Sequence, residues 1–323
     1  MKNKYFLLLL LILVFPIKAA ELDQYCTTSL ADGNFFKTDC SVNANFEGKK
    51  YCFGDKASKS VFIEDPKSIL AKANNFYTKT KGDNRTKISQ KMADELLEDP
   101  DCDLSSIDAG YLDFKGKDLT HCVMVNTSFF GADLRGANLS GGNLQRAYLN
   151  LARLEKTNFS GANLAEATMF QPIFGKTIFT GANLSNARII GTLGDVDMSG
   201  AILTKGRLGL DVGNQPMGQM KFDSSGGNFV KANFEGADLY IASFIFGDLR
   251  GANLRNTNLQ RAELVKTDLR GADLTNADLT NADVDGANFE GVIGLSSIKG
   301  FLTVKGKCEN CGMYLVKKTK KTP

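Results

Sequence analysis

The residues best suited to chemistry in this chain are its cysteines, above all Cys308 and Cys311, which enclose Glu309 and Asn310. A Cys-x-x-Cys pair can close as a small local disulfide, exchange with other thiols, or supply half of a zinc site. Zinc takes four ligands, and beyond this pair the sequence offers His121 and scattered cysteines. A thioredoxin-like enzyme would place the motif beside a βαβ pattern, which is missing here. We therefore expect a disulfide between Cys308 and Cys311, with a thiol or metal role as the alternative.

The other five cysteines fall in two groups. The chain has seven cysteines in all, so disulfide formation in an oxidising compartment would leave one thiol over. Cys26, Cys40 and Cys52 lie near the N-terminus, and their pairing stays open. Cys102 and Cys122 are 20 residues apart and share one position of the repeat described below. We expect these two to be small buried core residues, because side chains that stack in parallel are poorly directed for a bridge.

Sets of residues that could catalyse a reaction are absent from the sequence. His121 is the single histidine, and it falls at a repeat corner, where it would face outward. No glycine-rich loop follows a strand and opens a helix, as phosphate binding would require. Most aspartates recur at one outward position of the repeat and are expected to be solvated. We expect no enzyme activity, no cofactor, no metal and no small-molecule substrate.

A five-residue repeat organises the second half of the chain, as in the run GADLR-GANLS that begins at Gly131. Each repeat has Leu or Phe at its centre, usually Ala two positions earlier, and Asp or Asn one position earlier. A helix cannot use this period, and neither can a straight strand, because an odd period alternates between its faces. The chain must therefore turn a corner in every repeat, and Gly or Asn two positions after the centre suits the positive φ of that corner. The expected inward core includes Leu134, Leu139, Leu164, Leu184, Leu254 and Leu274.

This pattern resembles the pentapeptide-repeat family, whose motif is A(D/N)LXX, over roughly Cys102 to Val292. The resemblance implies a right-handed quadrilateral β-helix with four repeats per coil. Residues 20 positions apart would then stack on neighbouring coils. An amide ladder is expected from one such row, Asn143, Asn163 and Asn183.

Two rows of carboxylates would stack in the same way and repel each other unless a cation or a basic partner relieves them. The rows are Asp248 with Asp268, and Glu263 with Asp283. Calcium is not expected there, because it needs six or more converging oxygens.

The repeat is interrupted between residues 190 and 228. The centres on either side, Ile189 and Phe229, are 40 positions apart, which equals eight pentapeptides or two coils. A deletion of one residue before Met198 would be cancelled by an insertion of one residue after Leu208. We therefore expect one continuous solenoid of about ten coils over 102–293, with a loop near 209–227, rather than two stacks joined by a linker.

The N-terminal part differs from the repeats. Residues 1–20 have a basic start, a short apolar run and small residues, which predicts a signal peptide cleaved after Ala19 or Ala20, with a retained membrane anchor as the alternative. Residues 21–101 form a cysteine-containing segment with two helices. The first would bury a face of Ile69, Leu70, Ala73, Phe76 and Tyr77, and the second a face of Ile88, Met92, Leu96 and Leu97. The two helices would cap the open end of the solenoid.

The C-terminal segment 294–323 is expected to be a tail, and it carries 7 basic residues against 1 acidic residue. Its lysines, among them Lys317, Lys318, Lys320 and Lys321, could contact an anionic surface, whereas nucleic-acid binding is disfavoured because few aromatic residues interleave with them.

The function expected from these features is a non-enzymatic scaffold, exported to the periplasm or outside a bacterial cell, that binds a protein or another envelope component. Two alternatives remain. The resemblance allows a DNA mimic that binds gyrase, as some family members do, and the Cys308–Cys311 motif allows the thiol or metal role. The formal net charge of +3 does not match the acidity of a DNA mimic.

Overall fold

The computed structural model describes residues 22, 25–32, 36, 38–80, 85–210 and 220–311, with backbone alone for 75–80. The predicted signal peptide and the four lysines near the C-terminus lie outside these residues. The chain divides into two compact units, Met1–Tyr77 and Thr78–Pro323. This boundary falls in the last turn of the helix α3 (Pro66–Thr80), ahead of the second expected helix, whereas the sequence suggested one segment that ends at residue 101.

The first unit packs three helices and a hairpin around a small apolar core. Its elements are α1 (Thr27–Ala31), β1 (Val42–Phe46), β2 (Lys49–Phe53), α2 (Lys56–Glu64) and α3 (Pro66–Thr80). The strands β1 and β2 pair antiparallel, and Glu47 and Gly48 both take positive φ in the two-residue turn between them. Phe62 of α2 is 1% exposed and contacts the rings of Tyr51 and Phe53.

The three cysteines of this unit form one disulfide and leave one free thiol. Cys40 and Cys52 form a disulfide that closes onto β2, with an S–S distance of 1.83 Å. Cys26 keeps a free thiol, which is buried, so one cysteine is left over as expected. The face of α3 that includes Leu70 and Ala73 packs against this core, while the side chains of Phe76 and Tyr77 lie outside the described residues.

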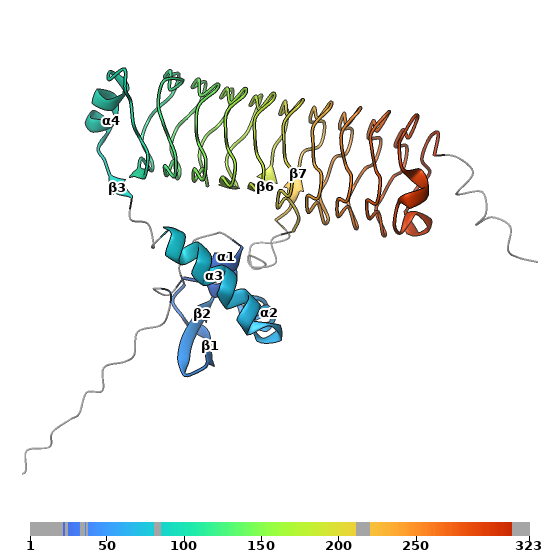
Figure 1. Ribbon diagram of the computed structural model, residues 1–323, viewed down its shortest axis with the longest axis horizontal. Coiled ribbons are helices and arrows are strands. Elements are labelled where there is room, and N and C mark those ends of the chain that lie inside the picture. The colour runs from blue at the N-terminus through green and yellow to red at the C-terminus, as the bar shows by residue number, and fades with distance from the viewer. Residues whose placement is uncertain are drawn as a thin grey trace, which may run out of the picture. The chain divides into compact units, whose positions relative to one another are not determined.

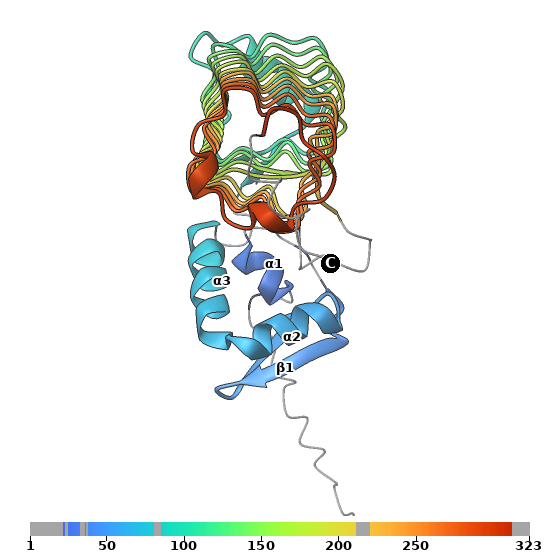
Figure 2. The same cartoon turned by 90° about the vertical axis from the view of Figure 1, so that its right-hand side faces the viewer.

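The second unit is a right-handed quadrilateral β-helix, as the sequence predicted. Figure 1 shows its coils stacked side by side, and Figure 2 looks along the stack at their four-sided outline. Most sides contribute one residue to a parallel bridge with the next coil, at a regular spacing of 20 residues. The row along one side is Asp103, Val123, Asn143, Asn163, Asn183, Ile202, Asn233, Asn253, Asp273 and Ile293.

A few sides pair over longer stretches and count as strands. These are β3 (Thr86–Lys87) with β4 (Ile107–Asp108), and β5 (Thr168–Phe170) with β6 (Arg188–Thr192) and β7 (Phe222–Asp223). All of these pairs are parallel. The backbone hydrogen bonds therefore run between coils, along the axis of the stack.

The corners explain why Asp or Asn precedes each central residue. The side-chain oxygen of Asp133 accepts a hydrogen bond from the backbone N–H of Arg135 at 3.2 Å, and Asn163 does the same for Ala165. This Asx turn holds the bend on its outer side. Because the turn is held in this way, even Lys231, whose repeat has the Asx turn of Asn228, takes the positive φ of a corner, at 59°. The sequence predicted only that these side chains are solvated, whereas in the structure they also stabilise the corners by accepting backbone hydrogen bonds.

The solenoid runs continuously through the interrupted middle, because bridges join Asn183 to Ile202 and Ile202 to Asn233. The deletion of one residue is confirmed by the spacing of 19 between Ile178 and Asp197. The expected insertion of one residue after Leu208 is wrong, because Asp197 and its next partner, Asn228, are 31 residues apart, which is eleven more than the regular spacing of 20. The surplus falls in a segment that includes residues 211–219, which lie outside the described part of the chain.

One helix closes the N-terminal end of the stack. In α4 (Gln90–Leu97), Ala93 is fully buried, and Leu96 and Leu97 pack against the core of the first coil. Met92 is 46% exposed, so the apolar face lies about a residue away from its expected position. Of the two helices expected to cap the solenoid, α4 contributes to its core, whereas the described side chains of α3 belong to the core of the first unit.

The other end is closed by residues expected to be a tail. Residues 294–311 form a last coil, in which Lys299, Lys305 and Glu309 bridge to the coil before. Its corners carry the short helices η3 (Leu295–Ser297) and η4 (Phe301–Thr303), which lengthen two sides to six residues. The five-residue period is therefore hidden in this stretch. No helix among the described residues combines the length and the apolar character needed to cross a membrane.

Candidate functional site

The leucines expected in the repeat core all lie inside the solenoid. Each is 0% exposed, so none can touch a ligand. The set is Leu134, Leu139, Leu164, Leu184, Leu254 and Leu274. A functional site must therefore use the outward positions, the corners or the two ends.

Cys308 and Cys311 form a disulfide with an S–S distance of 2.10 Å and a Cα–Cα distance of 5.9 Å. Cys311 is 5% exposed and belongs to the apolar core of the last coil. Between the two cysteines, Asn310 donates a hydrogen bond to the Oδ1 atom of Asn288 at 3.0 Å. The motif therefore forms the last side of the stack that the structure describes, and Glu309 within it bridges to Asn288 of the coil before.

Cys102 and Cys122 also form a disulfide, with an S–S distance of 2.06 Å, so the expectation of two unbridged core residues is wrong. Stacking on neighbouring coils brings their Cα atoms to 4.5 Å, which is within the range that a disulfide spans. At this short Cα–Cα distance, the parallel directions of the two Cβ atoms do not prevent a disulfide.

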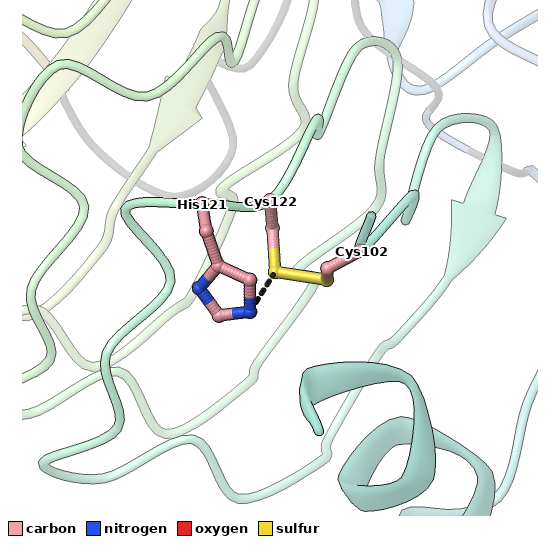
Figure 3. A group of neighbouring side chains, drawn as sticks. All are labelled: Cys102, His121 and Cys122. Atoms are coloured by element: carbon pink, nitrogen blue, oxygen red, sulfur yellow. Dashed lines mark hydrogen bonds between the residues drawn. A yellow bond between two sulfur atoms is a disulfide. The ribbon is translucent and has the colours of Figure 1, made fainter. Parts of the chain in front are cut away.

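His121 lies beside this disulfide (Figure 3), at the outward corner where the sequence placed it. Its Nε2 atom is 3.9 Å from the Sγ atom of Cys122 and 3.2 Å from the backbone oxygen of Leu97, at the end of α4. The ligand atoms of Cys102, His121 and Cys122 all lie within 4.8 Å of one another. In the disulfide state the two sulfurs are bonded to each other and offer no thiolate to a metal.

The stacked carboxylates are neutralised within the chain, so they need no external cation. The guanidinium of Arg250 binds the carboxylate of Asp248 at 2.6 Å, and Arg270 binds that of Asp268 in the same way. Arg250 also lies 3.8 Å from Asp268, which links the two coils. The Arg270 guanidinium, and then its backbone N–H, hold the pKa of Asp268 below its ordinary value, against the opposing effect of burial.

The second carboxylate row is relieved in a similar way at one of its members. Lys221 binds Glu263 at 2.6 Å, and Asp283 is followed on the next coil by Lys305. The basic partner considered from the sequence is thus supplied by this chain itself.

The expected amide ladder is confirmed. Asn163 donates to the Oδ1 atom of Asn143 at 3.2 Å, and Asn183 donates to Asn163 at the same distance. Because these bonds join the amides of three successive coils, with Asn163 bonded on both sides, this row is a structural device rather than a binding site.

A row of three aromatic side chains on the outside of the first three coils was not expected from the sequence; one ring is exposed and the other two are half-buried. Tyr111 is 73% exposed and meets the ring of Phe130 edge-on at 5.4 Å. Phe130 stacks with Tyr148 at 6.1 Å, and the guanidinium of Arg85 lies 5.6 Å from the centre of the Tyr148 ring. We call Tyr111, Phe130 and Tyr148 the aromatic row. The sequence contains a sign of this row, because all three aromatic residues occupy outward positions of their repeats, where polar residues are the rule.

Comparison with known families gives a match to the pentapeptide-repeat model, in 8 copies, over residues 102–141, 132–169, 225–256 and 252–291. These ranges leave out residues 170–224, which contain the interrupted middle, and they leave out the last coil. No curated protein sequence matches the chain.

Among solved structures, the chain is similar to HetL of Nostoc sp. strain PCC 7120, described as a pentapeptide-repeat protein involved in heterocyst differentiation regulation. The identity is 25%, with 64% of this chain and 86% of HetL covered and a TM-score of 0.44. A pentapeptide-repeat protein of the Arabidopsis thaliana thylakoid lumen is 32% identical, over 30% of this chain and 59% of that one, with a TM-score of 0.26. A trypsin-treated form of QnrB1, a plasmid-mediated fluoroquinolone resistance protein, is 19% identical, over 66% and 93%, with a TM-score of 0.30.

Proposed function

This chain belongs to the pentapeptide-repeat family, and from that premise we propose that it is a non-enzymatic scaffold that binds a protein of the bacterial cell envelope. The binding surface in this proposal is the aromatic row on the outside of the first coils. The proposal has two parts, binding and export, and each has its own test.

The observation that carries the binding part is the exposure of Tyr111, which is the most exposed large apolar or aromatic side chain among the described residues. An aromatic ring that is 73% exposed and in edge-on contact with a second ring, Phe130, is a typical anchor for a protein partner. The row rests on rigid coils, so little side-chain or backbone freedom would be lost on binding. At the other end of the row, the guanidinium of Arg85 lies over the Tyr148 ring and donates hydrogen bonds to Asn126, at 2.6 Å to its backbone oxygen and at 3.3 Å to its Oδ1 atom.

Matched substitutions test this surface. Tyr111 and Phe246 are both exposed aromatic residues at corners with positive φ, of 62° and 58°, but they lie in different blocks of the solenoid. Asparagine tolerates this backbone conformation, so Tyr111→Asn and Phe246→Asn should both fold. We expect affinity capture from solubilised envelopes to lose a specific partner with Tyr111→Asn and to retain it with Phe246→Asn. Equal capture by both variants and the unsubstituted chain would contradict the assignment of the surface.

Export rests on residues 1–20, whose basic start and short apolar run are typical of a signal peptide. Disulfides at three pairs of cysteines suit an oxidising compartment, which supports this part of the proposal. Cell fractionation with mass measurement of the N-terminus tests it. A protein found in the cytosol with its first 20 residues intact would refute export while leaving the binding surface untouched.

The DNA-mimic alternative is less well supported by the charge distribution. Such a surface needs rows of carboxylates that remain available to a basic partner. Asp248 and Asp268 are instead paired with Arg250 and Arg270. The thiol or metal alternative at Cys308 and Cys311 is weakened by the burial of Cys311 in the last coil.

A further inference from the structure

The corner formed by Cys102, His121 and Cys122 joins two sulfurs and an imidazole in a place that the proposed scaffold role does not use. We propose that reduction of the Cys102–Cys122 disulfide turns this corner into a zinc site with Cys102, His121 and Cys122 as ligands. The corner would then have two covalent states, a disulfide under oxidising conditions and a metal site under reducing ones.

The distances already present are close to those that zinc requires. Zinc binds sulfur at about 2.3 Å and imidazole nitrogen at about 2.0 Å, so tetrahedral ligand atoms lie about 3.3 to 3.8 Å apart. The three ligand atoms here lie within 4.8 Å of one another, and Nε2 of His121 is 3.9 Å from Sγ of Cys122. Once the sulfur–sulfur bond opens, side-chain rotation is sufficient to bring them to this spacing.

The chemistry of the donors selects the metal. Two thiolates and one imidazole suit zinc, whereas magnesium and calcium prefer oxygen ligands. The thiolates also balance the double charge of zinc, which matters because Cys102 and Cys122 are only 1% and 3% exposed. His121 is exposed and gives the metal a path from solvent, and water can take the fourth position.

The reaction balances with a named reductant. A phosphine supplies two electrons to the disulfide and takes up the oxygen of one water molecule as a phosphine oxide, and each cysteine sulfur takes up one of the two protons of that water. Zinc binding then releases these two protons, because the thiolate is the form that binds the metal. Either state cross-links the first two coils, beneath the end of α4.

The single histidine makes a direct test possible. In the full chain, labelled with ¹⁵N, the imidazole nitrogens of His121 give the only histidine ring signals. After reduction with a phosphine in the absence of oxygen, one equivalent of zinc should shift the Nε2 signal, and the oxidised protein should show no shift. Circular dichroism of the reduced protein checks that the solenoid persists.

Variants separate this corner from the other cysteines. Cys102→Ser should abolish the shift of the His121 signal, and Cys308→Ser should leave it unchanged. His121→Ala should weaken zinc binding by more than about tenfold, because even the loss of a neighbour that only orients a ligand costs that much. The proposal is overturned by a His121 signal that zinc does not move in the reduced protein, by an equal shift in Cys102→Ser, or by loss of the solenoid signal that zinc does not restore.

Discussion

At the scale of single residues, the outward aspartates act through the hydrogen bonds they accept rather than through the charge they present. Asp268 accepts from the backbone N–H of Arg270 and from its guanidinium. Both interactions favour the ionised carboxylate, and the pKa of Asp268 is accordingly held below its ordinary value of 3.8.

Asp268→Asn isolates the contribution of this charge, because the amide oxygen can still accept the backbone N–H. A carboxyl whose folded pKa is lowered stabilises the fold above its ordinary pKa, and the stabilisation is lost as the pH falls through that value and through the lower folded pKa. We expect the variant to be less stable than the unsubstituted chain at pH 7, and the difference to shrink as the pH is lowered from 7 through the ordinary pKa of the carboxyl. Urea unfolding across this range measures it. A difference that stays constant down to acidic pH would contradict the role of the charge.

Gly131 offers a second test at this scale, because a Cβ atom there would lie 2.7 Å from the ring of Tyr111. Gly136 has a similar φ of 65°, against 63° for Gly131, and nothing within 4 Å of such an atom. Alanine at either position should therefore lower the free energy of unfolding by about 1–2 kcal/mol, because the left-handed backbone conformation is strained for a residue with a Cβ atom. Only Gly131→Ala should also displace the exposed ring of Tyr111 and weaken capture of the partner.

Urea unfolding and the capture assay distinguish the two effects at Gly131. Equal capture by Gly131→Ala and Gly136→Ala would show that the position of the Tyr111 ring is unimportant for binding.

At the scale of elements, the ends of the solenoid depend on buried caps that differ from the repeat. Phe301 of η4 is 5% exposed and contacts the ring of Phe289 at 5.8 Å, while its neighbour Leu302 is 56% exposed. Phe301→Ala should cost about 3–5 kcal/mol locally. In a repeat protein the loss is confined first to the nearest coil, so the amides of residues 294–311 should exchange faster with solvent.

Leu302→Ala is the control for this element, and it should leave exchange unchanged. Hydrogen exchange read by mass spectrometry resolves the last coil from the coils before it. Faster exchange throughout the solenoid in Phe301→Ala, rather than at its end, would contradict a local cap.

The sequence predicts the coils well where the repeat spacing is regular and poorly where it is not. The regular coils follow from the period of five, since Leu, Ala and Asp or Asn each have one possible direction. The last coil resembles a tail in the sequence, because two of its sides have six residues and the five-residue period is lost there. The disulfide of Cys102 and Cys122 was missed because the argument considered the direction of the side chains and not the closeness of stacked backbones.

The aromatic row and the ion pairs between arginine and aspartate could have been predicted from the sequence. Tyr111 and Phe130 are conspicuous at outward positions, and Asp268 is followed two residues later by Arg270 in the same repeat. What the sequence alone could not provide is which outward neighbours on successive coils actually touch. That depends on rotamers, as with the guanidinium of Arg85 beside the Tyr148 ring.

At the scale of the whole repeat unit, the interrupted middle decides whether the two regular blocks are one cooperative body. Bridges pass through it without a gap, and Leu203 is fully buried in the apolar core that the two blocks share. If stability is transmitted between neighbouring coils, a defect at this point should weaken the coupling of both blocks.

Leu203→Ala should lower stability by about 2–5 kcal/mol, because it leaves a cavity in the core. The neighbouring Ile202 is 40% exposed, so Ile202→Ala serves as the control and should have little effect. Hydrogen exchange of peptides from 130–165 and from 250–285 reports on each block in the same sample. In a single cooperative stack both sets of peptides lose protection together in Leu203→Ala. Loss of protection in one block alone would mean that the solenoid, although continuous in its hydrogen bonds, behaves as two separate stacks.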